Sequence, residues 1–294
     1  MVEGGTMTAS PAAPASSAAA PFARVAVGQF GHDADFHVTC DRFVEVAQAA
    51  VAAGAGLVVM PEYWFGTFQG APADAMILAE HVAATYEEVS RQLDIMIAGN
   101  IVEPGQDGVP RNVGVVYQHG ARMLAQDKMH PMPREAKSGI VGGLSLRATD
   151  VAGRRLGMLV CADILYPEAA RVLELQGADL LLNPVMSPYS EHDLTGSARD
   201  SLYIARAYDS RAFVIKAAGY LRPGLIQRPD GGEFAIAGRS LIAAPWGLLA
   251  RYQDHFGHQV LVADLDWERL AAFRAHQSGF PPRRPDAYGE LTSG

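Results

Sequence analysis

Short apolar runs alternate along this chain with longer amphipathic stretches, and this alternation limits the folds open to it. The apolar runs predict strands over 25–30, 57–60, 95–101, 113–117, 123–125, 156–160, 180–182, 213–217, 240–243 and 260–263. The pair His119-Gly120 predicts a turn between the fourth and fifth of these strands. Helices are predicted over 43–53, 167–176, 201–208 and 267–276. Strands that alternate with helices call for a mostly parallel or mixed sheet covered by helices, which is an α/β fold.

Length and composition favour one large folded unit. The chain has 294 residues, and 49% hydrophobic against 19% charged residues can bury a large core. Residues 8–21 are almost entirely Ala, Pro and Ser, without the basic start or the Leu-rich centre of a signal peptide. We therefore predict a disordered tail over 1–21, with Met7 as a candidate start, and one domain over 22–294. The Pro-rich segment 280–285 predicts an arm that leaves the body.

Charge and cysteine content exclude several classes of protein. The net charge of −8 and the scattered basic residues argue against nucleic-acid binding, which needs a concentrated basic surface. The apolar runs are too short to cross a bilayer, so no membrane association is predicted. Only two cysteines occur, Cys40 and Cys161, which is too few for a disulfide framework. The predicted setting is therefore the reducing cytoplasm.

Cys161 occupies the position in this chain that most favours catalysis. The apolar run 156–160 leads directly into it, and a predicted helix begins a few residues later. A thiol there lies at the carboxyl end of a strand, where open α/β sheets bind their ligands. A helix N-terminus and the next backbone N–H can lower the pKa of a thiol and bind a developing oxyanion. The alternative is a structural cysteine that fills a gap in the core.

Glu62 and Lys128 also follow predicted strands. The run 57–60 stops at Pro61-Glu62, and aromatic side chains follow the glutamate (Tyr63, Trp64, Phe65 and Phe68). A carboxylate against aromatic walls loses solvation, which raises its pKa and suits a general base. Lys128 follows the run 123–125, and Glu135 lies on a loop beyond it. Taken singly, each of these residues is more often a solvated charge, and His130 is more often a structural hydrogen-bonding partner.

Taken together and in this order, these residues resemble the carbon–nitrogen hydrolase (nitrilase) superfamily over nearly all of 24–289. The resemblance rests on Val-Met-Pro-Glu62, on Asp-Lys128-Met-His130 and on Cys161-Ala-Asp-Ile-Leu-Tyr-Pro-Glu168. Weaker markers are Gly99, Asn112, 177–179, 205–207, 238–240, 245–247 and 284–288. Several motifs in one order across so long a stretch make chance agreement implausible.

The resemblance implies both a fold and a set of roles. The implied fold is a four-layer α-β-β-α sandwich whose copies associate through helical faces, so a homodimer or higher homo-oligomer is expected. Glu62 would be the general base, Lys128 would stabilise the tetrahedral intermediate, and Cys161 would be the acylated nucleophile. Glu135 would be an auxiliary carboxylate.

The resemblance also implies how substrate is held. The backbone N–H of Ala162 would be the second oxyanion donor, and Tyr63, Met186 and Ser187 would contact substrate. The loop 186–189 should line the pocket. No metal or organic cofactor is implied, and the nine histidines show no ligand spacing.

The implied activity is hydrolysis of a non-peptide C–N bond in a small aliphatic amide or carbamoyl compound, through a cysteine acyl-enzyme and water. Many amidase-like members carry Cys-Tyr-Asp-x-Arg-Phe-Pro-Glu, whereas this chain has Ala162 and Leu165 in place of the tyrosine and the arginine. The missing arginine suggests a substrate whose acyl part is neutral or cationic, unless an arginine from elsewhere in the chain, Arg134 for example, reaches the pocket.

There are three alternatives to this function. A nitrilase would use the same residues, but its typical Trp-Glu pair after the cysteine is absent, since Ala162-Asp163 stands there. An acyl transferase would pass the acyl group to an acceptor other than water. A catalytically idle binding or scaffold protein is disfavoured because Glu62, Lys128, Glu135 and Cys161 are all present.

Overall fold

The computed structural model describes residues 22–33, 35–66, 71–188, 196–227, 233–252, 254–279 and 281–292. The predicted tail 1–21 lies outside these residues, and so do Phe68, Tyr189 and Phe280. The predictions made for them therefore stay predictions.

Two six-stranded sheets form the centre of the molecule. The first has the order β15 (Gln259–Asp264), β1 (Arg24–Gln29), β2 (Leu57–Val59), β3 (Met96–Pro104), β4 (Pro110–Gln118) and β5 (Ala121–Asp127). The second has the order β14 (Gly247–Arg251), β13 (Leu241–Ala244), β10 (Phe213–Ala218), β8 (Leu180–Val185), β7 (Arg154–Met158) and β6 (Thr149–Val151). Each sheet has a parallel centre, β1-β2-β3 in one and β7-β8-β10 in the other, with antiparallel strands at the edges.

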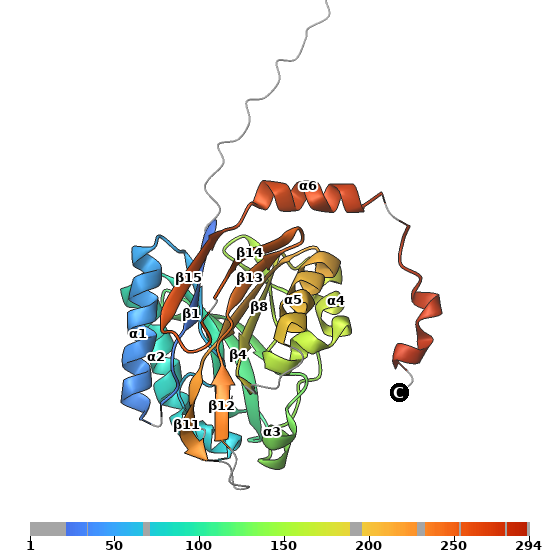
Figure 1. Ribbon diagram of the computed structural model, residues 1–294. Helices are drawn as coiled ribbons and strands as arrows, with labels where there is room; N and C mark the ends of the chain where they lie inside the picture. The colour runs from blue at the N-terminus through green and yellow to red at the C-terminus, as the bar shows by residue number, and fades with distance from the viewer. Residues whose placement is uncertain are drawn as a thin grey trace, which may run out of the picture.

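Helices cover the outer face of each sheet, which gives the predicted four layers (Figure 1). Helices α1 (Phe36–Ala52) and α2 (Ala79–Gln92) lie on the first sheet, and α4 (Pro167–Leu175) and α5 (Gly196–Ser210) lie on the second. A small third sheet consists of β11 (Leu221–Gln227), β12 (Glu233–Ala237) and β9 (Ser187–Pro188). The predicted α/β class and α-β-β-α sandwich are therefore confirmed.

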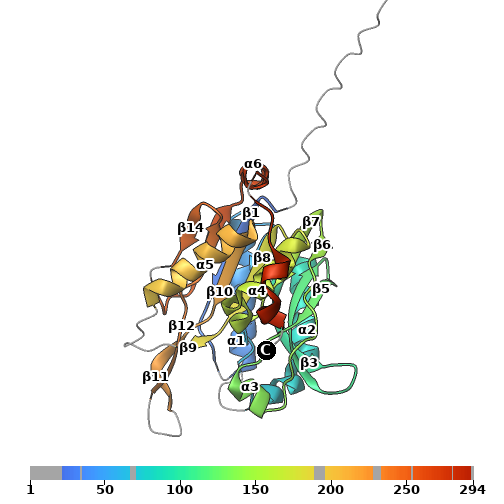
Figure 2. The same cartoon turned by 90° about the vertical axis from the view of Figure 1, so that its right-hand side faces the viewer.

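The chain leaves this body at its C-terminal end. Helix α6 (Trp267–Gln277) crosses the top of the sandwich, and the following segment extends away from it (Figures 1 and 2). That segment holds the short helices η3 (Pro285–Ala287) and η4 (Gly289–Thr292), and residues 281–291 are exposed. The predicted C-terminal arm is thus present from residue 281 onward.

The two-residue repeat of the strands explains how one chain fills three apolar layers. Leu180 and Leu182 point into the core between the sheets, whereas Leu181 between them points into the core under α4 and α5. Val25 and Ala26 divide in the same way between the inter-sheet core and the core under α1 and α2. Each such side chain, fully buried, contributes roughly 1.5–3 kcal/mol.

The helix boundaries show where sequence patterns are weak. Helix α1 begins at Phe36, earlier than predicted, because the Asp35 side chain accepts a hydrogen bond of 2.8 Å from the His37 backbone N–H and caps the helix. Helix α2 was not predicted, since only Val82, Tyr86 and Val89 are its buried apolar residues.

The predicted turn between β4 and β5 is confirmed. His119 and Gly120 both have positive φ, at 51° and 81°, which suits a tight hairpin. No helix of the described residues is long and apolar enough to cross a membrane.

Candidate active site

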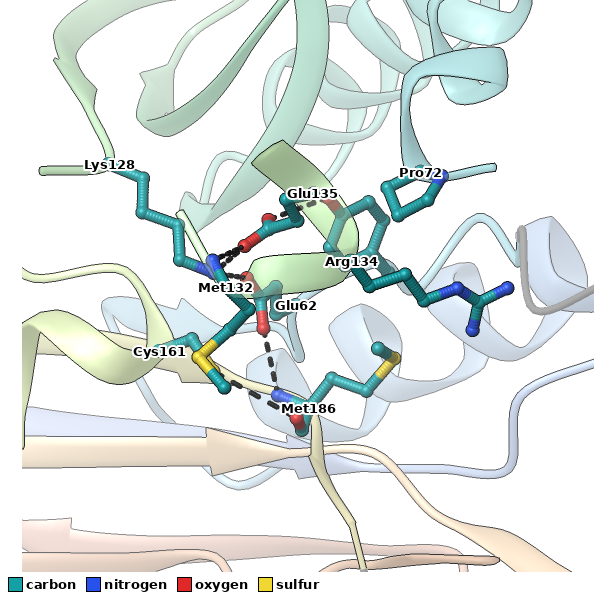
Figure 3. Close-up of a pocket in the computed structure, with 9 residues that line it drawn as sticks. Glu62, Pro72, Lys128, Met132, Arg134, Glu135, Cys161 and Met186 are labelled. Carbon is teal, nitrogen blue, oxygen red and sulfur yellow. Dashed lines mark hydrogen bonds and ion pairs between the residues drawn. The ribbon is translucent and has the colours of Figure 1, made fainter. Parts of the chain in front are cut away.

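The candidate catalytic residues lie where parallel strands of both sheets end. Glu62 follows β2 of the first sheet, while Cys161 and Met186 follow β7 and β8 of the second. Lys128 follows directly after β5. Glu135 belongs to the short helix α3 (Pro133–Lys137), which lies beside these strand ends. Figure 3 shows their side chains directed toward one another from the different elements.

Lys128 forms ion pairs with both glutamates. Its Nζ is 2.9 Å from Glu62 Oε1 and 2.8 Å from Glu135 Oε2. All three side chains are at least 95% buried. Two carboxylates around one ammonium leave a formal charge of −1. Because the three side chains are buried, water screens the attraction between them only weakly.

Asn112 holds the two carboxylates in place. Its Nδ2 donates to Glu62 Oε1 at 3.0 Å and to Glu135 Oε1 at 2.8 Å. The Tyr63 hydroxyl donates to Glu135 Oε1 at 2.8 Å, and the Met132 N–H donates to Glu135 Oε2 at 2.6 Å. Sequence reasoning named Asn112 only as a family marker. It is buried in β4, and its role depends on the two glutamates, which are distant from it in the sequence.

Cys161 begins the short helix η2 (Cys161–Leu165) with a left-handed backbone, at φ = 50°. A residue with a side chain seldom adopts this conformation, and such strain is concentrated at functional sites. The thiol donates a long contact of 3.9 Å to the Met186 carbonyl, and it lies near enough to Glu62 for the carboxylate charge to act on its pKa. The Met186 N–H in turn donates to Glu62 Oε2 at 3.0 Å. Thiol, carboxylate and ammonium are thereby brought together.

Asp163 connects the segment that follows Lys128 to the segment that contains the cysteine. It is fully buried and accepts hydrogen bonds from the backbone N–H groups of Met129, His130 and Val160, at 2.9–3.1 Å. His130 Nδ1 lies 2.9 Å from the same carboxylate. The structural hydrogen-bonding role predicted for His130 is confirmed.

Burial and neighbouring charges shift the pKa values of Glu62 and Glu135 in opposite directions. Burial raises the pKa of Glu62, the positive charge of Lys128 opposes this, and the negative charge of Glu135 adds to it. Burial would also raise the pKa of Glu135. Lys128 together with the Asn112 and Met132 donors nevertheless holds the pKa of Glu135 below its usual range. Glu62 is therefore the carboxylate suited to take up a proton, and Glu135 is the permanent anion.

The pKa of the Cys161 thiol is raised, whereas a helix N-terminus and the next backbone N–H would lower it. Burial raises the pKa of Cys161, and the neighbouring Glu62 carboxylate raises it further, while Lys128 only partly offsets them. Burial alone would lower the pKa of Lys128, but the anionic groups around it raise that pKa above its usual value. The resting site therefore holds a protonated thiol beside a carboxylate, and no preformed thiolate.

A pocket of about 440 Å³, counting its solvent-filled mouth, opens onto these groups. Its lining consists of Glu62, Tyr63, Pro72, Lys128, Met132, Arg134, Glu135, Cys161 and Met186. Two of the predicted substrate contacts, Tyr63 and Met186, are thus part of the lining. Ala162 is buried beside it. Ser187 lies in β9, paired with Ala237 of β12, and is not part of this lining, so its contact with substrate stays a prediction.

Leu165 lies outside the lining of the pocket, and its side chain is 57% exposed. The neutral or cationic acyl part predicted from this position stays a prediction. Arg134 lies in the lining instead, and its guanidinium extends away from the buried carboxylates (Figure 3).

An α-β-β-α sandwich with a glutamate–lysine–cysteine group at the ends of its strands is a fold and site of the nitrilase class. The family model described as carbon-nitrogen hydrolase matches residues 24–275. The chain therefore belongs to the carbon–nitrogen hydrolase family, and it is an enzyme.

Named relatives and solved structures agree with this assignment. The chain is 29% identical over 270 residues to deaminated glutathione amidase of Mus musculus, covering 84% of this chain and 79% of the relative. It is 24% identical over 277 residues to N-carbamoylputrescine amidase of Arabidopsis thaliana, covering 90% and 93%. A carbon-nitrogen hydrolase from Helicobacter pylori G27 has the same fold, with a TM-score of 0.82 and 22% identity, covering 92% of this chain and 98% of that one.

A further solved structure is a mutant of the amidase from Nesterenkonia sp. AN1. It shows covalent addition of the acetamide moiety of fluoroacetamide at the active site cysteine. Its TM-score to this chain is 0.69 at 23% identity, covering 87% of this chain and 96% of that one.

Proposed function

We propose that this enzyme is an amidase that hydrolyses a small amide or carbamoyl compound through an acyl-enzyme on Cys161. The observation that carries the proposal is that the Cys161 thiol lines one pocket together with Glu62, a buried carboxylate paired with Lys128 at 2.9 Å. An amide is a poor electrophile, and a covalent intermediate divides its hydrolysis into two easier steps.

In the first step Glu62 takes the thiol proton as the sulfur attacks the carbonyl carbon. Because the pKa of the thiol is raised, attack and proton transfer have to be coupled, and a positioned general base typically contributes 10²–10⁴-fold, roughly, in rate. The carbonyl oxygen becomes an oxyanion between the Lys128 ammonium and the Ala162 N–H. Loss of one such donor typically costs about 3–4 kcal/mol. Glu62 then returns the proton to the departing nitrogen.

In the second step water hydrolyses the thioester. Glu62 again serves as the base, taking a proton from water as its oxygen attacks the acyl carbon. The carbon–sulfur bond breaks, and Glu62 returns the proton to the sulfur. Glu135 keeps Lys128 charged and in place throughout, since it stays ionised and pairs with Nζ at 2.8 Å.

Two observations favour amides and carbamoyl compounds over nitriles. Asp163 follows the nucleophile by two residues, as in the amidase-like pattern, and the relatives are named as amidases. A nitrilase is the alternative. An idle scaffold role is disfavoured because a buried group of two carboxylates and one ammonium costs stability, and a chain without catalysis has no reason to keep it.

The lining indicates the form of the substrate. Tyr63, Met132 and Met186 present largely apolar surface beside the nucleophile, which suits a short aliphatic acyl chain. Arg134 adds a positive charge to the lining. We therefore expect an acyl part that carries a carboxylate to be accepted, in place of the neutral or cationic preference predicted from Leu165.

An ammonia-release assay tests the proposal. The panel contains aliphatic amides, dicarboxylate monoamides, N-carbamoyl compounds and the matching nitriles, with Cys161→Ala as the blank. We expect ammonia from amides or carbamoyl compounds and none from the blank. Faster turnover of the nitriles than of their amides would contradict the proposal and assign the protein to the nitrilase branch.

The outer helical faces support the predicted association of copies. Val172 and Leu175 on α4 and Tyr208 on α5 are 40–58% exposed. Large apolar side chains gathered on adjacent helices suit a homodimer or larger homo-oligomer. Light scattering across a concentration series tests this, and a monomer at every concentration would contradict it.

A further inference from the structure

Asn183 contacts the backbone segment that carries the nucleophile Cys161. It lies in β8 and is fully buried. Its Nδ2 donates to the Cys161 carbonyl at 3.2 Å and also to the Leu159 carbonyl. Its Oδ1 accepts from the Tyr203 hydroxyl at 2.7 Å. All the hydrogen-bonding groups of the amide are therefore used, and both donors reach the segment that contains Cys161.

The contact with the Cys161 carbonyl has a consequence for the next N–H group. The carbonyl of Cys161 and the N–H of Ala162 belong to one planar trans peptide, in which they point in opposite directions. A donor that holds the oxygen therefore fixes the direction of the N–H. The same donor polarises the peptide and strengthens its N–H as a hydrogen-bond donor. Because Cys161 is in the strained left-handed conformation, this peptide needs such an external restraint.

Neighbouring side chains set the orientation of the amide. The Tyr203 hydroxyl, on α5, binds the amide oxygen, so the amide nitrogen has to face Leu159 and Cys161. Lys216 on the adjacent strand β10 is in register with Asn183, and its Nζ lies 5.3 Å from the centre of the Tyr203 ring. Tyr203 and Lys216 are themselves buried, at 4% and 2% exposure. The support of the nucleophile therefore extends across two strands and a helix.

We propose that Asn183 is a positioning residue that aims the Ala162 N–H at the oxyanion. This inference rests on the proposed function, in which that N–H stabilises the tetrahedral intermediate. Asn183 touches no reacting atom, and its effect passes through one peptide plane. Without it the thiol keeps its contact with Met186 and its place in the pocket beside Glu62, but the oxyanion loses a correctly directed donor.

The test compares two reactions of Cys161. Hydrolysis of an amide passes through an oxyanion, whereas alkylation by iodoacetamide is a displacement at carbon that forms none. We expect Asn183→Leu and Asn183→Asp to lower kcat about 10- to 100-fold, less than the full loss of a donor, while KM and the alkylation rate stay near the wild-type values. Tyr203→Phe leaves both N–H donors of the Asn183 amide in place and removes only the hydrogen bond that orients them, so its kcat should fall less.

The control is Val214→Ala, which removes buried volume from β10 on the same face of the sheet. It should lose stability and retain kcat. Unchanged kcat in both folded Asn183 variants would overturn the inference, and so would a parallel fall of kcat and alkylation. Should the Asn183 variants not fold, unchanged kcat in Tyr203→Phe would overturn it and a lowered kcat with normal alkylation would support it. Undiminished turnover by Cys161→Ala would instead contradict the proposed function.

Discussion

Replacement of Lys128 by methionine removes the one ammonium between two buried carboxylates. Its Nζ lies 2.9 Å from Glu62 and 2.8 Å from Glu135, whose side chains are 1% and 5% exposed. Breaking a buried ion pair on one side typically costs about 3–5 kcal/mol, because an uncompensated charge stays buried. We expect a loss of this size at pH 8, together with loss of amide turnover.

The loss should depend on pH with a defined sign. Without Lys128, burial and the charge of Glu135 raise the folded-state pKa of Glu62 further above its unfolded value of about 4.3. The folded variant then binds a proton that the unfolded chain has released, so its stability falls as pH rises between the unfolded and folded pKa values. Relative to wild type, the variant should be less destabilised at pH 5 than at pH 8.

Urea unfolding at the two pH values measures this difference. The double variant Lys128→Met/Glu62→Gln is the control, because it removes one of the two unpaired charges. We expect it to be more stable at pH 8 than Lys128→Met alone, as contacting residues are not additive. A loss below about 1 kcal/mol that does not change with pH, or strictly additive losses in the double variant, would refute the reasoning.

Three further predictions follow from the site and the chain. The acid limb of the pH profile of kcat/KM should lie above the ordinary glutamate value, since Glu62 must be ionised and its pKa is raised; a limb at or below about 4.3 would contradict this. Arg134→Gln should raise KM for dicarboxylate monoamides more than for neutral amides, and an equal change in both would remove Arg134 from substrate recognition. Deletion of residues 1–21 should leave the melting temperature unchanged, because Phe22 is the buried residue that anchors this end; a clear drop would show that the tail packs on the body.

The parts of the fold that the sequence predicts are the apolar strands. The run that leads to Cys161 and the run that leads to Glu62 are buried in the centres of their sheets, so their residues are almost all apolar. Such runs are visible because every side chain has to avoid water. Helix α2 and strand β11 lie at the periphery and carry fewer apolar residues, so periodicity alone did not reveal them.

Some residues of the candidate site are likewise recognisable in the sequence, and others are not. Glu62, Lys128 and Cys161 each follow an apolar strand, and that position makes them recognisable in the sequence. Asn112 and Asn183 lie inside β4 and β8, and their roles depend on partners that are distant in the sequence. Such contacts arise only when the strands of the two sheets are brought together. The raised thiol pKa is invisible in the sequence for the same reason, since burial and the charge of Glu62 act through space.

The central claim is that Cys161 is acylated during turnover. The most direct measurement is peptide mapping by mass spectrometry after acid quench of the enzyme mixed with an amide that it turns over. The account predicts an acyl mass on the peptide that contains Cys161, cleaved by hydroxylamine as a thioester, and neither adduct nor turnover in Cys161→Ala. Undiminished turnover by the folded Cys161→Ala variant would contradict it.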